Sequence, residues 1–342
     1  MFNNENPSEH YFNELLVVFR TPYADLTQMQ MPLLDPPDLA EWGLHCFCVG
    51  ARRTPHGAIA ADNNGRILFL ARDGVTVSGL ASVGVPCLES QIEWLKAIGI
   101  LSVTNGVLRT RFPTLGTEII GMLRDRSRRH ATSTLARISP AVAAVGDALA
   151  LAGAQEHHYA VLFGHGLDGL LWHRLRLEGS MPSTELSLDS PYWNGGFWAV
   201  HPKRIGAAGT NESTRDHKTL VTVWSDASVQ DLRKISRMWE LGIWSERVPV
   251  ICVGPDEDAI HTACGEVAQV VAEALKILVG ELQSAGLDWV EREQLLLIAG
   301  HEFIWDIAEQ LCQTGQLVQP RALRQSGTHA DDLKALIHIR SV

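Results

Sequence analysis

The sequence has few cysteines, and their spacing matches no common framework. Six of the 342 residues are cysteines, and no two of them form a Cys-x-x-Cys pair. A small secreted domain held by disulfides and a zinc ribbon both need paired cysteines, so the composition favours neither. Isolated thiols within apolar runs, such as Cys252, are typical of a buried core. The sequence accordingly assigns no metal ligand and no catalytic residue.

Long apolar runs are also lacking, and so is a signal-like start. No run of apolar residues approaches the roughly 20 residues that a membrane-spanning helix needs. The first ten residues lack the basic start and apolar core of a signal peptide. We therefore expect a cytoplasmic protein with no membrane partner.

Basic residues are fewer than acidic residues in the chain as a whole. The chain has 29 lysines and arginines against 39 acidic residues, a formal net charge of −10. This balance argues against a protein that binds nucleic acid non-specifically. Residues 106–137 are the exception, with seven arginines and two acidic residues. The sequence leaves two interpretations open for this region, a site for an acidic partner or a solvated helix face.

The N-terminal third has the pattern of a winged helix. Three helix-like segments, 38–53, 62–73 and 86–98, precede two short strand patterns. Asn105-Gly106 joins these strands, and this dipeptide is a strong hairpin signal because both positions of a type I′ turn need positive φ. We expect a winged-helix-like recognition module over residues 1–115 and a helical connector over residues 116–155.

A glycine motif follows the connector. The apolar run Tyr159–Phe163 leads into Gly164, Gly166 and Gly169, and a helix-like pattern comes next. A strand, a Gly-x-Gly-x-x-Gly turn and a helix in this order form a phosphate-binding unit of nucleotide-binding folds. A glycine-rich connection without a ligand is the alternative that the sequence leaves open.

Strand and helix patterns alternate after this motif. The sequence predicts a strand over 219–224 that ends just before Asp226, a helix over 228–241, a strand over 248–253 and a helix over 264–282. Such alternation predicts an α/β class with a Rossmann-like, mostly parallel sheet. The expected α/β domain covers residues 156–285, and a helical C-terminal extension covers residues 286–342.

In this order, these segments resemble the core of the E1-like (ThiF-like) adenylating fold. The resemblance implies that Gly164, Gly166 and Gly169 hold nucleotide phosphates and that Asp226 holds magnesium, with ATP and Mg²⁺ as cofactors. Only Asp189 could stand for the acidic residue that the family carries after its second strand. Lys203 and Arg204 are further candidates for contacting phosphate.

The sequence departs from active members of this family. No Asn-x-x-Arg-Gln segment follows Asp189, and the paired zinc cysteines are missing. These departures favour a scaffold without adenylation activity, and therefore without ATP and Mg²⁺, over an ATP-dependent adenylating enzyme. A winged-helix-like module before an E1-like domain resembles proteins of ribosomal peptide natural-product maturation, including the ThiF-like partners of YcaO cyclodehydratases.

The resemblance implies a leader-peptide recognition component that works with a YcaO-type or other modifying enzyme. A winged helix can take an extended leader peptide as an added strand beside its hairpin. The candidate peptide contacts lie on the third helix and the hairpin: Ile92, Leu95, Val107, Leu108, Arg109 and Arg111. A winged-helix transcription regulator is another alternative, weakened because Glu89 and Glu93 lie on the helix that would meet DNA and only Gln91 and Lys96 offer contacts. The aromatic stretch 192–198 favours a subunit interface or a core edge, so a homodimer stays open.

Overall fold

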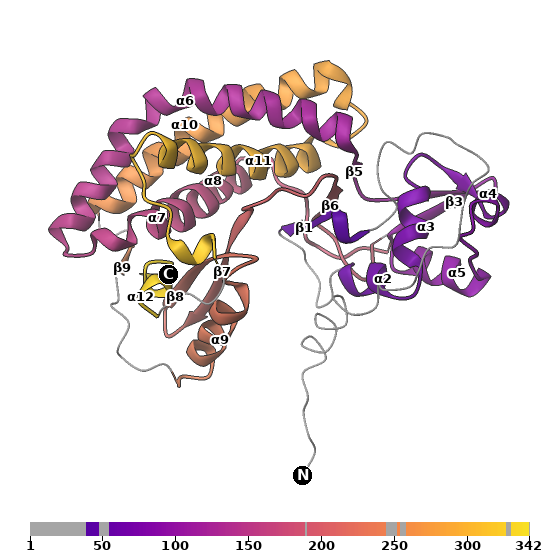
Figure 1. Cartoon of the computed structure of the whole chain (residues 1–342), viewed down its shortest axis with the longest axis horizontal. Coiled ribbons are helices and arrows are strands. Elements are labelled where there is room, and N and C mark those ends of the chain that lie inside the picture. Colours follow the sequence, from indigo (N-terminus) through magenta and orange to yellow (C-terminus); the bar gives the residue numbers. More distant parts are fainter. Residues whose placement is uncertain are drawn as a thin grey trace, which may run out of the picture. The chain divides into compact units, whose positions relative to one another are not determined.

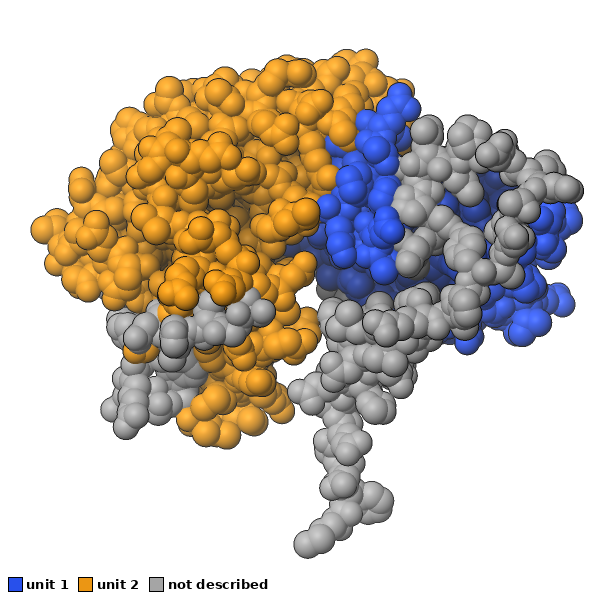
Figure 2. Space-filling view, viewed as in Figure 1, with its two compact units in different colours: residues 1–120, 182–203 blue, residues 121–181, 204–342 orange. Residues whose placement is uncertain are grey.

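The computed structural model describes residues 39–47, 55–188, 190–243, 252–253, 258–325 and 330–341. The described chain is mixed α/β with three small sheets. Its contacts divide it into two compact units: unit 1 comprises residues 1–120 and 182–203, and unit 2 comprises residues 121–181 and 204–342 (Figure 2). Each unit is described by itself.

Unit 1 contains short helices and two three-stranded sheets. Its elements are η1 (Leu39–Glu41), β1 (Gly43–Phe47), α2 (His56–Ala60), α3 (Asn64–Leu70), β2 (Val75–Thr76), α4 (Val77–Ser82), α5 (Glu89–Ala97), β3 (Leu101–Thr104), β4 (Val107–Thr110), β5 (Thr114–Leu115) and β6 (Gly196–Val200). The strand orders are β2-β4-β3 and β1-β6-β5. The second sheet exists because residues 182–203 return to unit 1 and place the fully buried β6 between β1 and β5.

The predicted hairpin is confirmed. β3 and β4 are antiparallel, Thr104 faces Val107, and Asn105 and Gly106 have φ of 52° and 78°. Two positive φ angles are what a two-residue turn of the primed type requires. The predicted helix over 86–98 is also present as α5. The first predicted helix, over 38–53, is wrong where the chain is described, because residues 43–47 form β1.

Unit 2 combines long helices with a four-stranded sheet (Figure 1). Its elements are α6 (Thr117–Leu151, which begins in unit 1), η2 (Gln155–His157), α7 (His158–Val161), η3 (Leu162–Leu170), α8 (Leu171–Leu177), β7 (Ala208–Arg215), β8 (Lys218–Ser225), α9 (Val229–Glu240), β9 (Cys252–Val253), α10 (Asp258–Leu282), η4 (Gln283–Leu287), α11 (Arg292–Gln313), η5 (Arg321–Leu323), α12 (Ala330–Lys334) and β10 (Ile337–Ser341). The long helix α10 packs against η3, α8 and α11. Its apolar face, from Ile260 to Leu282, is buried there.

The expected mostly parallel sheet is wrong. The sheet of unit 2 has the order β7-β8-β10-β9, and only β9 and β10 pair in parallel. The reason is local: β7 and β8 are joined by a tight turn in which Asp216 and His217 have φ of 51° and 62°, so no helix crosses over between them. The predicted strand over 219–224 and the helix over 228–241 are confirmed as β8 and α9.

The C-terminal segment is not wholly helical as expected. Helix α11 is followed by β10, which lies between β8 and β9 in the sheet. The chain end therefore supplies a central strand, antiparallel to β8 and parallel to β9.

The expected strand before the glycine motif is also wrong. Residues 158–177 run as one helical stretch, formed by α7, η3 and α8, and η3 has π-helical hydrogen bonding. Gly164 is the reason this stretch can lie close to the sheet, since a Cβ there would meet Val221 and Val223 of β8 at 3.2 and 3.3 Å.

Candidate functional site

Strand β3 forms one edge of the three-stranded sheet β2-β4-β3 in unit 1. Among the described strands, β3 pairs only with β4. The amide of Arg111 donates to the carbonyl of Ile100, and this hydrogen bond shows which residues of β3 bond to β4 and which do not. Main-chain groups alternate along an antiparallel strand, so the N–H and C=O of Leu101 and Val103 point away from β4. An edge of this kind presents main-chain donors and acceptors to an incoming strand where it is exposed, which holds for Val103 at 36% but not for Leu101 at 2%.

Exposed apolar side chains lie on the elements that lead into this edge. Leu88 and Trp94 of the α5 region are 67% and 44% exposed, although large apolar side chains more often lie inside. The other exposed apolar residues of α4, its C-cap and β3 are Val77, Val83 and Val103. Exposed apolar side chains beside an open sheet edge are typical of a surface that binds another chain.

The structure divides the six predicted peptide contacts. Ile92, Leu95 and Leu108 are buried in the core of unit 1, so their prediction as peptide contacts is corrected. Their spacing in the sequence placed them on the apolar faces of the helix and the strand. A buried core and an apolar docking face have the same periodicity, so the spacing does not distinguish them. Val107 is half-buried, whereas Arg109 and Arg111 are exposed. Arg109 donates from Nη1 to the carbonyl of Asp73 at 3.1 Å.

The basic region 106–137 is largely balanced by acids from distant parts of the chain. Arg124 pairs with Glu302 at 2.9 Å, and Arg137 pairs with Glu273 at 2.8 Å. Arg126 lies 3.8 Å from Glu281. Most of the local excess that the sequence indicated is therefore matched within unit 2 by α10 and α11.

The predicted nucleotide-binding residues do not form a phosphate cradle. Gly164, Gly166 and Gly169 lie in the helical stretch of η3, where Gly164 and Gly166 are buried. A phosphate-binding glycine loop needs a turn whose backbone amides point to the ligand, whereas these amides lie within a helix. Asp226 is exposed in the turn between β8 and α9, and Asp189 lies outside the described residues. Arg204, a further candidate for contacting phosphate, instead donates hydrogen bonds to the carboxylates of Glu302 and Asp306.

Replacing Gly164 or Gly166 by alanine tests whether the motif is a packed helix or a phosphate-binding turn. We expect Gly166→Ala to raise the free energy of unfolding by about 0.5–1 kcal/mol, because the new Cβ would lie 3.6 Å from Cys264 and alanine favours a helix. Gly164→Ala should lower it by about 1 kcal/mol or more, because its Cβ would lie 3.1 Å from Cε1 of His338 and 3.2 Å from Val221. Urea denaturation measures both values. The opposite order of the two variants would contradict the helical packing.

A cluster of histidines lies between η3, α10 and β10. Nε2 of His165 is 3.2 Å from Nδ1 of His261, and the rings of His165 and His338 have centroids 6.4 Å apart. Burial, then the charges of Arg340 and His261, lower the pKa of His165 to about 3. Burial likewise lowers the pKa of His338 well below its ordinary value. His165 and His338 are therefore neutral at physiological pH.

Asp168 is a buried carboxylate of the same π-helical segment. It accepts hydrogen bonds from Nε1 of Trp172 at 2.7 Å and from the hydroxyl of Thr210 at 2.7 Å. Burial raises its pKa, and the nearby His301 acts in the opposite direction. The two hydrogen bonds engage both oxygens, so Asp168 fixes α8 and β7 rather than offering an open oxygen to a ligand.

Buried ion pairs form a second polar cluster in unit 2. Arg204 donates to Glu302 at 2.8 Å and to Asp306 at 2.6 Å, and Arg124 donates to Glu302. Glu302 and Asp306 are 2% and 1% exposed. The stretch from His301 to Asp306 is buried in α11. No spacing within the sequence could have paired Arg204 with residues about a hundred positions away.

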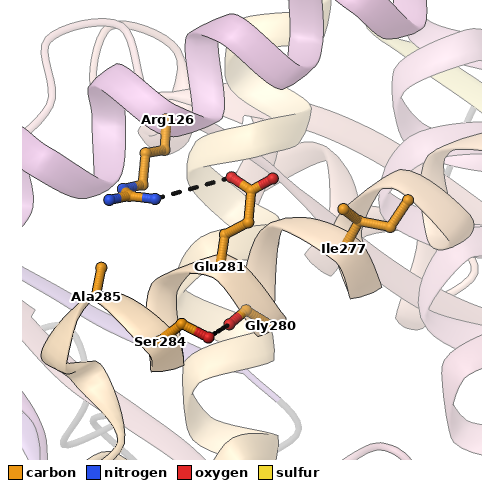
Figure 3. Close-up of a pocket in the computed structure, with 6 residues that line it drawn as sticks. All are labelled: Arg126, Ile277, Gly280, Glu281, Ser284 and Ala285. Carbon is orange, nitrogen blue, oxygen red and sulfur yellow. Dashed lines mark hydrogen bonds and ion pairs between the residues drawn. The ribbon is translucent and has the colours of Figure 1, made fainter.

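A shallow depression lies on the surface between α6 and α10. Figure 3 shows Arg126 of α6 reaching toward Glu281 of α10, with Ile277 and Gly280 beside it. Ser284 donates to the carbonyl of Gly280 at 2.9 Å, which leaves its hydroxyl engaged. The depression is open to solvent and holds one ion pair, so it carries no candidate chemistry.

Among the described helices, one passes a test of length and composition for crossing a membrane. Helix α6 has a window of mean hydropathy 1.3, and 33% of that window is buried. Core helices of soluble proteins pass the same test, so this is weak evidence.

Known proteins add no assignment to these sites. No protein-family model, no curated protein and no solved structure matches the chain.

Proposed function

We propose that unit 1 is a winged-helix module that binds an extended peptide by strand addition to the open edge of β3. The observation that carries this proposal is Val103, whose main-chain groups point away from β4 and which is 36% exposed. In strand addition, main-chain hydrogen bonds supply affinity and alternate side chains supply specificity.

The element order supports the winged-helix interpretation. Helix α3 is followed by β2, by the two helices α4 and α5, and by the hairpin of β3 and β4. The strand order β2-β4-β3 places the first strand beside the second strand of the hairpin. This leaves β3 at the edge, next to the helix that precedes it.

The surface of α5 favours a peptide over DNA. Glu89 and Glu93 are exposed on it, and carboxylates repel phosphate. Both groups that could have contacted DNA are engaged within the unit. Gln91 caps the backbone amide of Leu88 and donates to Asn63 at 2.9 Å, and Lys96 pairs with Glu93 at 2.8 Å.

The same surface indicates the chemistry of the peptide. Trp94, Leu88 and Val103 are apolar and exposed, and two of the three charged residues on α5 are acidic. We propose a segment with apolar side chains at alternate positions, flanked by few acidic residues. A leader peptide presented to a modifying enzyme is the class that the sequence resemblance suggests.

Proline at position 103 tests strand addition directly. The N–H of Val103 points away from β4, so Val103→Pro removes an outward donor and leaves the hairpin ladder intact. A lost main-chain hydrogen bond of about 0.5–1.5 kcal/mol, together with the bulk of the ring, should weaken binding by about tenfold or more. The measurement is fluorescence anisotropy of the full chain with labelled decapeptides recovered from a random display library.

Val103→Thr is the matched control, because it changes the same side chain and keeps the backbone donor. We expect it to bind within about threefold of the parent chain, since the edge hydrogen bonds are retained. Circular dichroism checks that both variants fold. Equal affinity of Val103→Pro and Val103→Thr, or a library that yields no binder, would rule out the proposed function.

A further inference from the structure

Three imidazoles from distant parts of the chain meet in unit 2. His165 comes from η3, His261 from the start of α10 and His338 from β10. The rings of His165 and His261 have centroids 5.3 Å apart, and their facing nitrogens are separated by 3.2 Å. His338 is buried, and neither of its ring nitrogens has a hydrogen-bond partner among the described residues.

We propose that His165, His261 and His338 form a binding site for a transition-metal cation of the Zn²⁺, Cu²⁺ and Ni²⁺ class. Imidazole nitrogens bind zinc at about 2.0–2.1 Å. Two nitrogens 3.2 Å apart would subtend about 100° at an ion held at that distance, which is close to a tetrahedral angle. Nε2 of His165 and Nδ1 of His261 are therefore already as far apart as two ligand atoms of one ion would be.

His338 completes the set by a movement of its ring. Within the described residues, no three side chains already stand where they could share one ion. The ring of His338 lies 6.4 Å from that of His165, slightly farther than the His165–His261 pair. Because its nitrogens make no hydrogen bond in the described structure, turning the ring breaks none, and coordination would satisfy a buried polar atom.

The ligand set favours a transition metal. Arg340 lies nearby and its positive charge acts on His165 and His338, and its ion pair with Glu212 at 2.5 Å offsets part of that charge. Metal-binding histidines must be neutral, and burial holds the pKa of His165 and His338 below the ordinary value. His261 is half-buried at the start of its helix, which gives an ion a path from solvent. Imidazole ligands suit Zn²⁺, Cu²⁺ and Ni²⁺, whereas Mg²⁺ prefers oxygen.

Calorimetric titration of the metal-free full chain with zinc chloride tests the site. We expect one equivalent of Zn²⁺ to bind with a micromolar or tighter dissociation constant, and Mg²⁺ not to bind. At a hundredfold excess over that constant, the melting temperature should rise by on the order of 5 °C. His261→Ala and His338→Leu should each weaken zinc binding by at least tenfold.

His173→Ala is the matched control, because His173 is an exposed histidine of α8 in the same unit. It should bind zinc as the parent chain does. Circular dichroism checks the fold, and His261→Gln replaces His261→Ala if the alanine variant does not fold. Unchanged zinc affinity in the His261 or His338 variant, or an equal loss in His173→Ala, would overturn the assignment.

Discussion

Replacing Arg204 by methionine is expected to lower the free energy of unfolding of unit 2 by about 3–5 kcal/mol. Arg204 donates to both Glu302 and Asp306, which are 2% and 1% exposed. Burial alone would lower the pKa of Arg204, but these two carboxylates raise it, so the ion pairs outweigh the loss of hydration. Without the guanidinium, Glu302 keeps Arg124, whereas Asp306 keeps only the hydroxyl of Ser127 among its described partners.

Urea denaturation followed by circular dichroism measures this loss. Arg237→Met is the control, because Arg237 pairs with Glu240 on the surface of α9, where the side chains are 65% and 45% exposed. Solvent screens such a pair, so its removal should cost no more than about 0.5 kcal/mol. Similar losses in the two variants would show that the buried cluster does not hold α11 in place.

Acid is expected to destabilise unit 2 strongly, beginning near pH 6.5. In the unfolded chain, His157, His165 and His338 take up protons near their ordinary pKa of about 6.5. In the folded chain, burial lowers the pKa of all three, that of His165 to about 3. The unfolded state therefore binds more protons below pH 6.5, and stability falls as the pH is lowered.

The size of this effect follows from the separation of the pKa values. Each such group contributes at most about 1.4 kcal/mol per pH unit, so His165 alone accounts for on the order of 4 kcal/mol by pH 3. Asp168 acts in the opposite direction, because burial raises its pKa. Histidines whose pKa is lowered by burial outnumber this one carboxylate in unit 2, so the net change is a loss.

Urea denaturation between pH 8 and pH 5 checks this profile. We expect constant stability above about pH 7 and a fall of roughly 2 kcal/mol or more by pH 5. His338→Leu should make the profile less steep, because one buried imidazole with a lowered pKa is gone. A flat profile in the parent chain would contradict the neutral, buried histidine cluster.

Local turn chemistry and strong periodicity made part of the fold predictable. Asn105-Gly106 predicted the hairpin of β3 and β4, because few other dipeptides accept positive φ at both positions. The β-branched run from Thr219 to Trp224 predicted β8, and the amphipathic spacing after Ser228 predicted α9. Each of these signals lies within a few residues of the element that it predicts.

The glycine motif was misread for a physical reason. The run from Tyr159 to Phe163 is short and wholly apolar, and such a run fits a buried helix as well as a buried strand. Glycines after it suggested a turn, but Gly164 serves close packing of a helix on the sheet instead. Helical propensity could not reveal this, because the contact is made with β8, nearly sixty residues later.

The sequence also could not predict which distant strands pair in the sheet of unit 2. β7 is polar, and its turn to β8 uses Asp216-His217, which is a weak hairpin signal. β10 is a five-residue strand near the chain end that becomes central only through pairing with β8 and β9. The hairpin was predicted, so the edge of β3 could be inferred from the sequence. Which apolar residues beside this edge face the core could be seen only in the packed structure.

Amide hydrogen exchange of the full chain, measured by NMR with and without a bound peptide, tests the central claim most directly. Strand addition predicts that the peptide slows exchange at Val103, whose N–H points away from β4 and which is exposed, by about tenfold or more. Ser102 and Thr104 already donate within the hairpin, so their exchange should change much less. Peptide binding that leaves Val103 unprotected would contradict recognition at the β3 edge.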